Sequence, residues 1–313
     1  MMFVDLKSLV IQIMCINFLG DAFPDEIKYD FSKVVIANID IETECENGFP
    51  DIENADERII AITMIIGDDY HIFGLGEFDI VREGKNVQQY KFDNEEDLLQ
   101  SFVDLWCDIQ PDIVTGWNID FFDIPYMVHR MQRLFGEDFP KRLSPWKVIR
   151  NRKVFMRDKK HNIYKILGVS VLDYLETYRN YTFVNQESYS LNHIAWVELG
   201  AKKLSYAEYD SLAEFYKRDF PKFMEYNVKD VELVQQLDAK LRLLELNASI
   251  AYLAKCNYED VFGQVRTWDC IIYQHLREQN IVVPQQKHQS KSEQYAGAYV
   301  KDPITGMHDW VVS

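Results

Sequence analysis

Residues 34–42 read VVIANIDIE, and this stretch decides the fold class. It is apolar on both faces and rich in β-branched side chains, which is typical of a central strand covered on both sides of a sheet. Two acids, Asp40 and Glu42, close its C-terminal end. A spacing of two places both carboxylates on one face of the strand. The alternative is that both tip into solvent at the strand end and have no further role.

The segments that follow alternate between strand and helix patterns. Two apolar runs joined by Gly67-Asp68-Asp69 predict a hairpin, and apolar residues at helical spacing before Pro111 predict an amphipathic helix. Pro125 opens a further helix, because proline is tolerated in a first helical turn. The predicted elements are strands at 58–66, 70–73 and 112–115 and helices at 94–109 and 125–135.

The C-terminal half continues this alternation. Strands are predicted within 147–171 around a polar turn at 157–162, and helices at 188–199, from 219 to about 253, and at 267–279. Strands followed by mixtures of strand and helix predict an α/β domain with a mixed β-sheet flanked by helices.

Length and composition narrow the class of protein. The 313 residues are 47% hydrophobic and 27% charged, which suits a globular chain with a sizeable core. The net charge of −16 argues against a uniformly basic surface that coats duplex DNA, although a local basic site is compatible with it. The five cysteines form no CxxC pair and are odd in number, so we expect reduced thiols in a cytoplasmic protein.

The sequence lacks the patterns typical of a membrane span and of the common cofactor-binding motifs. No apolar run reaches the roughly 18 residues of a transmembrane helix. The nearest run, 9–19, could be a signal-peptide core, but Gln12, Asn17 and the missing cleavage pattern favour a buried strand. Gly74-Leu75-Gly76 lacks the third glycine of a dinucleotide loop, and no Walker, GxSxG, HExxH or EF-hand sequence occurs.

Two further segments carry acids in distinctive positions. Residues 116–125 read GWNIDFFDIP between a predicted strand and a helix start, where Asp123 is either functional or only a helix cap. Tyr226-Asn227-Val228-Lys229-Asp230 places a phenol and a carboxylate on one helix face, because i and i+4 are neighbours there. Taken alone, Tyr226 and Asp230 would be ordinary surface residues.

The four acids Asp40, Glu42, Asp123 and Asp230 have the composition of a two-metal site. Buried carboxylates repel one another and lose hydration unless cations lie between them. Hard divalent cations roughly 3.5 to 4 Å apart, bridged by carboxylates, stabilise an in-line attack on phosphorus. The tyrosine hydroxyl would orient the attacking water.

The acidic segments also resemble a known family. Asp40-Ile41-Glu42-Thr43, residues 118–123 and residues 226–230 are similar, in order and spacing, to the three exonuclease motifs of family B DNA polymerases. Further segments resemble the polymerases of T-even-type bacteriophages. These segments are residues 26–30, 143–145, 171–174, 190–191, 267–269 and 295–301, and the resemblance covers nearly the whole chain.

The resemblance implies a ribonuclease H-like 3′→5′ exonuclease domain that removes 3′ nucleotides of single-stranded DNA during proofreading. It makes Asp40, Glu42, Asp123 and Asp230 the ligands of two Mg²⁺ or Mn²⁺ ions and Tyr226 the water-positioning residue. It further implies that Asn118 and Phe122 hold the unpaired 3′ end, with core packing as the alternative for Phe122. We interpret Asp173, which also closes a strand, as structural.

Departures from the family matter as well. We expect residues 1–30 to be a remnant of an N-terminal domain, 31–242 the exonuclease domain, 243–286 a helical segment that packs toward the N-terminal domain, and 287–313 the start of a palm. No Asp-Thr-Asp sequence occurs, so the polymerase site is expected to lie elsewhere. The expected partners are therefore primer-template DNA, a complementary polymerase chain and a sliding clamp reached through that chain, in the host cytoplasm if the protein is viral.

A basic run interrupts the acidic chain. Residues 141–165 hold ten bases and one acid, a net charge of +9, which leaves −25 for the remainder. Residues 153–165 resemble a family hairpin that lies between primer and template, so phosphate contact is favoured over a solvated hairpin. The expected DNA-binding residues are Asn118, Phe122, Arg152, Lys153, Arg157, Lys159, Lys160, Tyr295 and Gly297.

Two functions remain open at this point. One is a metal-dependent exonuclease, and the other is a non-catalytic fragment that binds DNA or docks to a polymerase chain. The complete carboxylate set favours the first. Apolar residues that would be left exposed near 250–271, among them Ile250, Leu253, Phe262 and Ile271, favour the second.

Overall fold

The computed structural model describes residues 18–19, 22–23, 28–46, 48–156, 159–201, 208–209, 211–282 and 306, without the side chains of residues 155, 156, 159 and 160. The chain divides into two compact units, residues 1–272 and 273–313. The first unit contains the sheets and most of the helices. The described part of the second unit consists of the end of the last helix, residues 279–282 and residue 306.

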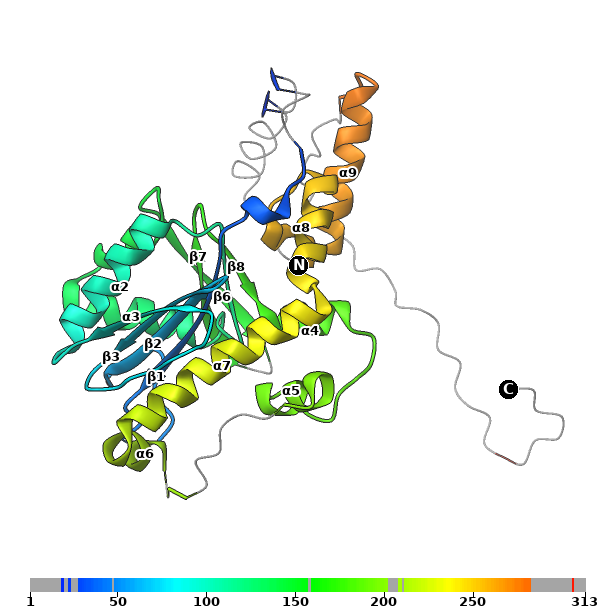
Figure 1. Ribbon diagram of the computed structural model, residues 1–313. Helices are drawn as coiled ribbons and strands as arrows, with labels where there is room; N and C mark the ends of the chain where they lie inside the picture. The colour runs from blue at the N-terminus through cyan, green and yellow to red at the C-terminus, as the bar shows by residue number, and fades with distance from the viewer. Residues whose placement is uncertain are drawn as a thin grey trace. The chain divides into compact units, whose positions relative to one another are not determined.

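A six-stranded mixed sheet with strand order β4-β3-β2-β1-β5-β8 forms the centre of the first unit (Figure 1). Strands β1 to β3 pair antiparallel, and the β3–β4, β1–β5 and β5–β8 pairs are parallel. The strands are β1 (Ile36–Thr43), β2 (Ile59–Ile66), β3 (Asp69–Gly74), β4 (Asn86–Lys91), β5 (Ile113–Gly116) and β8 (Ser170–Asp173). Strands β6 (Ile149–Met156) and β7 (Lys159–Ile166) form a separate antiparallel hairpin.

Helices cover the sheet on both faces (Figure 1). The helices of the described residues are α2 (Glu95–Ile109), α3 (Asp123–Phe135), α4 (Tyr174–Tyr181), α5 (Leu191–Leu199), α6 (Leu212–Arg218), α7 (Phe220–Leu241), α8 (Leu243–Ala254) and α9 (Gln264–Glu278), with short 3-10 turns η1 (Phe31–Lys33), η2 (Phe139–Leu143) and η3 (Tyr258–Phe262). Among the described residues, none of these helices is long and apolar enough to span a membrane.

The period of two along β1 assigns its side chains to two different environments. Ala37, Ile39 and Ile41 are buried in the core cluster that includes residues of α2 and α3. The intervening positions, Asn38, Asp40 and Glu42, therefore face the opposite side, where α7 packs. Burial of one apolar row fixes the strand register, and the register in turn delivers the two acids to the α7 side.

Most predicted elements are confirmed. The strand of residues 34–42 is central, with β2 on one side and β5 on the other, and the 58–73 hairpin is present as β2 and β3. Asn94 caps α2, as its side chain accepts a hydrogen bond from the backbone N–H of Asp97. The α/β class with a mixed sheet flanked by helices, consistent with a ribonuclease H-like domain, is also confirmed.

Several boundaries differ for identifiable reasons. The single helix predicted from 219 to about 253 is two helices, because Arg242 adopts a left-handed conformation (φ 53°) and the Asp238 carboxylate caps the second helix at Leu244. Helix α3 begins two residues before Pro125, and α5 begins after a Ser190 cap rather than at 188. Of the strand predicted at 9–19, only Phe18 and Leu19 are described, and both are helical and exposed.

Three elements were missed. Strand β4 reads NVQQYK, which is polar on both faces because the strand lies at the sheet edge. Helices α4 and α6 have only eight and seven residues, too few to show a helical period.

Candidate active site

Strand β1 carries Asp40 and Glu42 beneath helix α7. In the antiparallel register, Asp40 lies opposite Thr63 of β2 and Glu42 lies opposite Ala61. Asn38, on the same face of β1, donates from its side-chain amide to the carbonyl oxygen of Val231 in α7 at 2.8 Å. Helix α7 is thereby bonded directly to the strand that bears the two acids.

Helix α7 adds a third carboxylate to this pair. One carboxylate oxygen from each of Asp40, Glu42 and Asp230 lies within 4.8 Å of the other two. Asp230 is buried, with 4% of its surface exposed, and Asp40 and Glu42 are partly buried, so three like charges converge with reduced access to water. Carboxylate oxygens are the ligands that hard divalent cations prefer, and this donor set therefore fits Mg²⁺ or Mn²⁺.

Asp123 lies beside this cluster rather than within it. The residue is buried, and its Oδ1 accepts a hydrogen bond from the backbone N–H of Ile41 at 3.0 Å. Ile41 separates Asp40 from Glu42 in sequence, so the fourth predicted acid contacts the strand between the first two. Asp123 is the first residue of α3, Phe122 precedes it as the N-cap, and the Asp123 carboxylate bonds β1.

Tyr226 is one helical turn before Asp230 on α7. Its ring is 8% exposed and packs edge-on against Phe215 of α6, with 6.1 Å between ring centroids. Phe223 and Met224 belong to the same core cluster. The aromatic packing fixes the ring of Tyr226 on the helix that also carries Asp230.

The loop of residues 117–122 is held by Asp173. The Asp173 carboxylate accepts hydrogen bonds from the backbone N–H groups of Asn118 and Asp120, each at 3.1 Å, and also caps α4 at Leu175. Burial raises the pKa of Asp173 to about 6. Burial also raises the pKa of Asp120, and the negative charge of the nearby Asp173 adds a smaller increase. The structural role predicted for Asp173 is confirmed.

Two positions in the same segment have backbone reasons for their residue type. Asn118 has φ 68°, a left-handed conformation that asparagine tolerates better than most residues. A Cβ at Gly116 would lie 2.3 Å from the carbonyl oxygen of Ile39, so only glycine lets β5 approach β1 this closely. These requirements are compatible with a DNA contact at Asn118 but do not need one.

Phe122 is partly buried and contacts both a core residue and an exposed one. Its half-buried ring stacks on Tyr126, with centroids 5.6 Å apart, which agrees with the core-packing alternative. Its ring centroid also lies 5.3 Å from that of Phe49, which is 82% exposed. The sequence alone did not identify Phe49, although an aromatic residue in an otherwise polar, acidic loop is an available signal.

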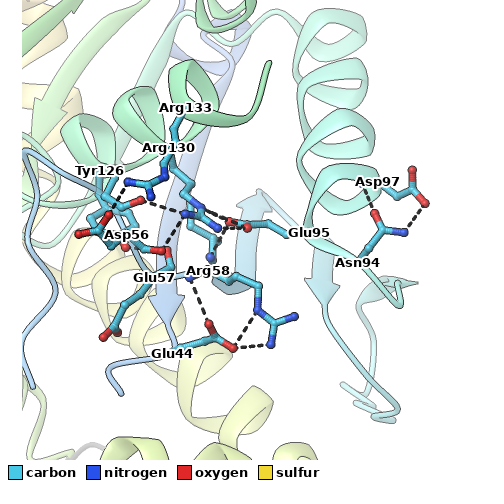
Figure 2. Close-up of polar contacts among 12 residues, drawn as sticks. Glu44, Asp56, Glu57, Arg58, Asn94, Glu95, Asp97, Tyr126, Arg130 and Arg133 are labelled. Carbon is cyan, nitrogen blue, oxygen red and sulfur yellow. Dashed lines mark hydrogen bonds and ion pairs between the residues drawn. The ribbon is translucent and has the colours of Figure 1, made fainter. Parts of the chain in front are cut away.

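Helices α2 and α3 brace the loop that follows β1. Figure 2 shows Arg130 of α3 between Glu95 and the backbone near Asp56; its guanidinium bonds the Glu95 carboxylate and the carbonyl oxygens of Ala55 and Asp56. The Tyr126 hydroxyl donates to the carbonyl oxygen of Glu57 at 2.7 Å. This bracing fixes residues 55–57, the C-terminal part of the loop that also carries Phe49.

Part of the acidity of this loop is already balanced. Glu44 pairs with Arg58, Glu46 with Lys217, and Asp56 with Arg133 (Figure 2 shows the first and last of these groups). The eight acids of residues 40–57 are therefore not all solvated: the Glu44–Arg58 pair joins the two ends of the loop, and the other two pairs tie the loop to α6 and α3.

The basic run forms the predicted hairpin. Arg152 and Lys153 of β6 are exposed, and neither forms an ion pair with a described residue. Lys159 and Lys160 are described as β7 backbone only, while Arg157, Tyr295 and Gly297 lie outside the described residues. Three other bases of the run are neutralised locally, in the pairs Lys141–Asp138, Arg142–Asp104 and Lys165–Glu259.

Helix α3 anchors this hairpin close to the candidate site. The two ring nitrogens of His129 lie 2.6 Å from the Ile52 carbonyl oxygen and 2.6 Å from the Tyr164 hydroxyl of β7. At the other end of the hairpin, the His161 ring meets Phe121 edge-on at 5.5 Å. Thus the hairpin contacts both the helix that begins with Asp123 and the loop that precedes it.

Two buried polar residues next to the acids were also missed. Thr63 is the single polar residue of β2, which is otherwise wholly apolar, and Asn227 lies inside the 226–230 segment. Both are completely buried. A lone polar residue in a buried strand was the available signal for Thr63, but its partner could not be named from the sequence.

Comparison with known proteins gives one consistent family. Residues 7–194 match the model of the exonuclease domain of DNA polymerase family B. The chain is 35% identical to a DNA-directed DNA polymerase of Escherichia phage RB69 over 99% of its length and 32% identical to that of Enterobacteria phage T4 over 96%. It is 29% identical to a DNA polymerase catalytic subunit of Alcelaphine herpesvirus 1 over 93%. It spans 37%, 36% and 29% of the length of these relatives.

Proposed function

Because this chain belongs to DNA polymerase family B through its exonuclease domain, we propose that it hydrolyses the 3′-terminal phosphodiester of single-stranded DNA. The observation that carries the proposal is the convergence of Asp40, Glu42 and Asp230 within 4.8 Å. Removal of mispaired nucleotides at a primer terminus is the role that this activity would serve in a polymerase.

The cation-binding residues would be Asp40, Glu42 and Asp230, with Asp123 as the fourth acid beside them. Two Mg²⁺ or Mn²⁺ ions held there would supply Lewis acidity and a metal-activated water for attack on the phosphorus atom. Tyr226, fixed by its packing on Phe215, would orient that water through its hydroxyl.

The unpaired DNA end needs a surface that accepts any base. Exposed aromatic rings provide one, since stacking on a base is tolerant of sequence. The exposed Phe49 and the half-buried Phe122 form such a pair on the loop and at the helix start next to the acids. The hairpin bases Arg152 and Lys153 would contact backbone phosphates farther along the strand.

Cleavage of a 5′-labelled single strand tests the proposal. The purified chain should shorten the strand from its 3′ end with Mg²⁺ or Mn²⁺ and be inert in chelator. Asp40→Ala should abolish cleavage, while Glu83→Ala, which removes an exposed acid from the loop before β4, should leave the rate unchanged. Full activity of Asp40→Ala would overturn the site assignment.

The second candidate function, a non-catalytic fragment that docks to another chain, is supported by a different observation. Leu253, Val265 and Trp268 are 77%, 77% and 63% exposed, whereas Ile250 and Phe262 are half-buried. Apolar exposure of this kind is typical of a surface that another protein segment covers. An inert but folded wild-type chain in the cleavage assay would favour this second function.

A further inference from the structure

We propose that Asn227, held by Thr63, is a positioning residue for the Asp40 carboxylate. The inference rests on the proposed exonuclease function and deepens it, because it assigns a residue that controls how the cation site is organised. Asn227 belongs to α7, Thr63 to β2 and Asp40 to β1. The three residues therefore join the strand and the helix that carry the acidic cluster to the neighbouring strand β2.

The contacts form a continuous chain of hydrogen bonds. The Thr63 hydroxyl donates to Asn227 Oδ1 at 2.5 Å, and Asn227 Nδ2 donates to Asp40 Oδ2 at 2.7 Å. Thr63 and Asn227 are fully buried. Without access to water, the Thr63 hydroxyl and the Asn227 amide depend on their protein partners, so the geometry of these two groups is strongly determined.

The chemistry of the three groups permits a single orientation of the amide. An ionised carboxylate only accepts hydrogen bonds, so the amide nitrogen of Asn227 must face Asp40. The amide oxygen then faces Thr63, whose hydroxyl is able to donate to it. A residue in place of Thr63 without a hydroxyl would leave the amide oxygen buried and without this donor.

The position of Thr63 follows from the strand register. Asp40 and Thr63 are directly opposite one another in the antiparallel β1–β2 pair and point to the same face. Asn227 reaches the two residues from α7, where Asp230 is three positions farther on. Any shift of α7 along the sheet would therefore change the Asn227 bond and the Asp230 position together.

This arrangement supplies what a cluster of like charges lacks. The Asn227 amide donates to Asp40 without adding a charge, so this carboxylate has a neutral hydrogen-bond partner beside the like charges of Glu42 and Asp230. It also fixes the rotation of the carboxylate before any cation arrives. Partners that orient a metal ligand in this way typically control metal affinity by 10- to 100-fold.

Mn²⁺ binding to the purified chain, followed by electron paramagnetic resonance, tests the inference without relying on cleavage. Asn227→Leu should raise the Kd for Mn²⁺ by about tenfold or more. Thr63→Val should act in the same direction by a smaller factor, and Thr63→Ser, which restores the hydroxyl, should return the Kd toward that of the wild type. Thermal unfolding in chelator shows whether each variant folds.

Asn38→Leu is the matched control. It removes another buried amide, one that bonds β1 to α7 through the Val231 carbonyl but has no hydrogen bond to a candidate ligand. If Asn227 merely held the helix on the sheet, Asn38→Leu would weaken Mn²⁺ binding as much as Asn227→Leu does, and the inference would be overturned. Should Asn227→Leu fail to fold, equal Kd values for Thr63→Val and wild type would overturn it independently.

The wild-type chain separates this inference from the function on which it rests. A wild-type chain that binds no Mn²⁺ would overturn the proposed function and this inference together. A wild-type chain that binds Mn²⁺ and cleaves DNA, with Kd values unchanged by Asn227→Leu and Thr63→Val, would overturn the positioning role alone.

Discussion

The Asp173 carboxylate accepts a hydrogen bond from the backbone N–H of Asn118 at 3.1 Å, although the two residues lie 55 positions apart in sequence. Together with the bond from the N–H of Asp120, this contact fixes the loop of residues 117–122, which has no regular secondary structure and leads into Asp123. The end of β8 thus positions the start of α3. A residue with no place in the proposed chemistry controls where one of the four acids lies.

Replacing Asp173 should therefore destabilise the domain. In Asp173→Ala, buried N–H groups of the loop and of the α4 N-terminus lose their acceptor, so we expect the free energy of unfolding to fall by about 3 to 5 kcal/mol. Asp30→Ala is the control, because Asp30 caps η1 at the surface. Its replacement should lower the free energy of unfolding by about 1 kcal/mol or less. Urea denaturation measures both; equal losses in the two variants would contradict the loop-holding role.

The pKa of Asp173 gives a separate prediction for pH. An acid whose pKa rises on folding, here from 3.8 to about 6, binds more protons in the folded chain. Its contribution to the free energy of unfolding therefore falls as the pH rises through this range and is constant above it. We expect the free energy of unfolding of the wild type, measured relative to that of Asp173→Asn, to fall by up to about 3 kcal/mol from pH 4 to pH 7. A difference that rises with pH would show that the backbone hydrogen bonds outweigh burial.

Gly116 offers a test of the contact between β5 and β1. A methyl group at this position would lie 2.3 Å from the Ile39 carbonyl oxygen and 2.5 Å from Ile119 Cγ2, so Gly116→Ala should lower the free energy of unfolding by about 3 kcal/mol. Gly263→Ala is the control, since the nearest atoms to its methyl group would lie at 3.4 Å. Similar unfolding midpoints for the two variants would mean that β5 moves aside readily.

The parts of the site that follow from short-range periodicity could be predicted from the sequence. A spacing of two places Asp40 and Glu42 on one strand face, and a spacing of four places Tyr226 and Asp230 on one helix face. The bond between Thr63 and Asn227 could not be predicted, because it depends on how α7 crosses β2. The same limit explains the missed strand β4, whose pairing with β3 determines its structure more than its polar sequence does.

Phe49 should contribute to DNA binding without contributing to stability. Its side chain is 82% exposed, so Phe49→Ala removes little buried area, but it removes a ring on which a base could stack. We expect affinity for a single strand to fall about tenfold, within the range of roughly 1 to 3 kcal/mol for one stacked base. Phe183→Ala is the control, as Phe183 is fully exposed on the loop between α4 and α5. A tenfold loss in both variants would point to nonspecific contact.

The hairpin bases give the last prediction. If Arg152 and Lys153 contact phosphates, Arg152→Gln and Lys153→Gln should weaken single-strand binding, and each contact removed should flatten the dependence of log K on log salt by roughly 0.7. Cleavage at saturating DNA should persist, because neither residue belongs to the acidic cluster. Lys141→Gln is the control, since Lys141 already pairs with Asp138 and offers less charge to DNA. Fluorescence anisotropy across a salt series measures the slopes. Slopes that stay at the wild-type value in Arg152→Gln and Lys153→Gln would identify the basic run as a solvated face, because exposed charges that do not touch the strand are screened by salt.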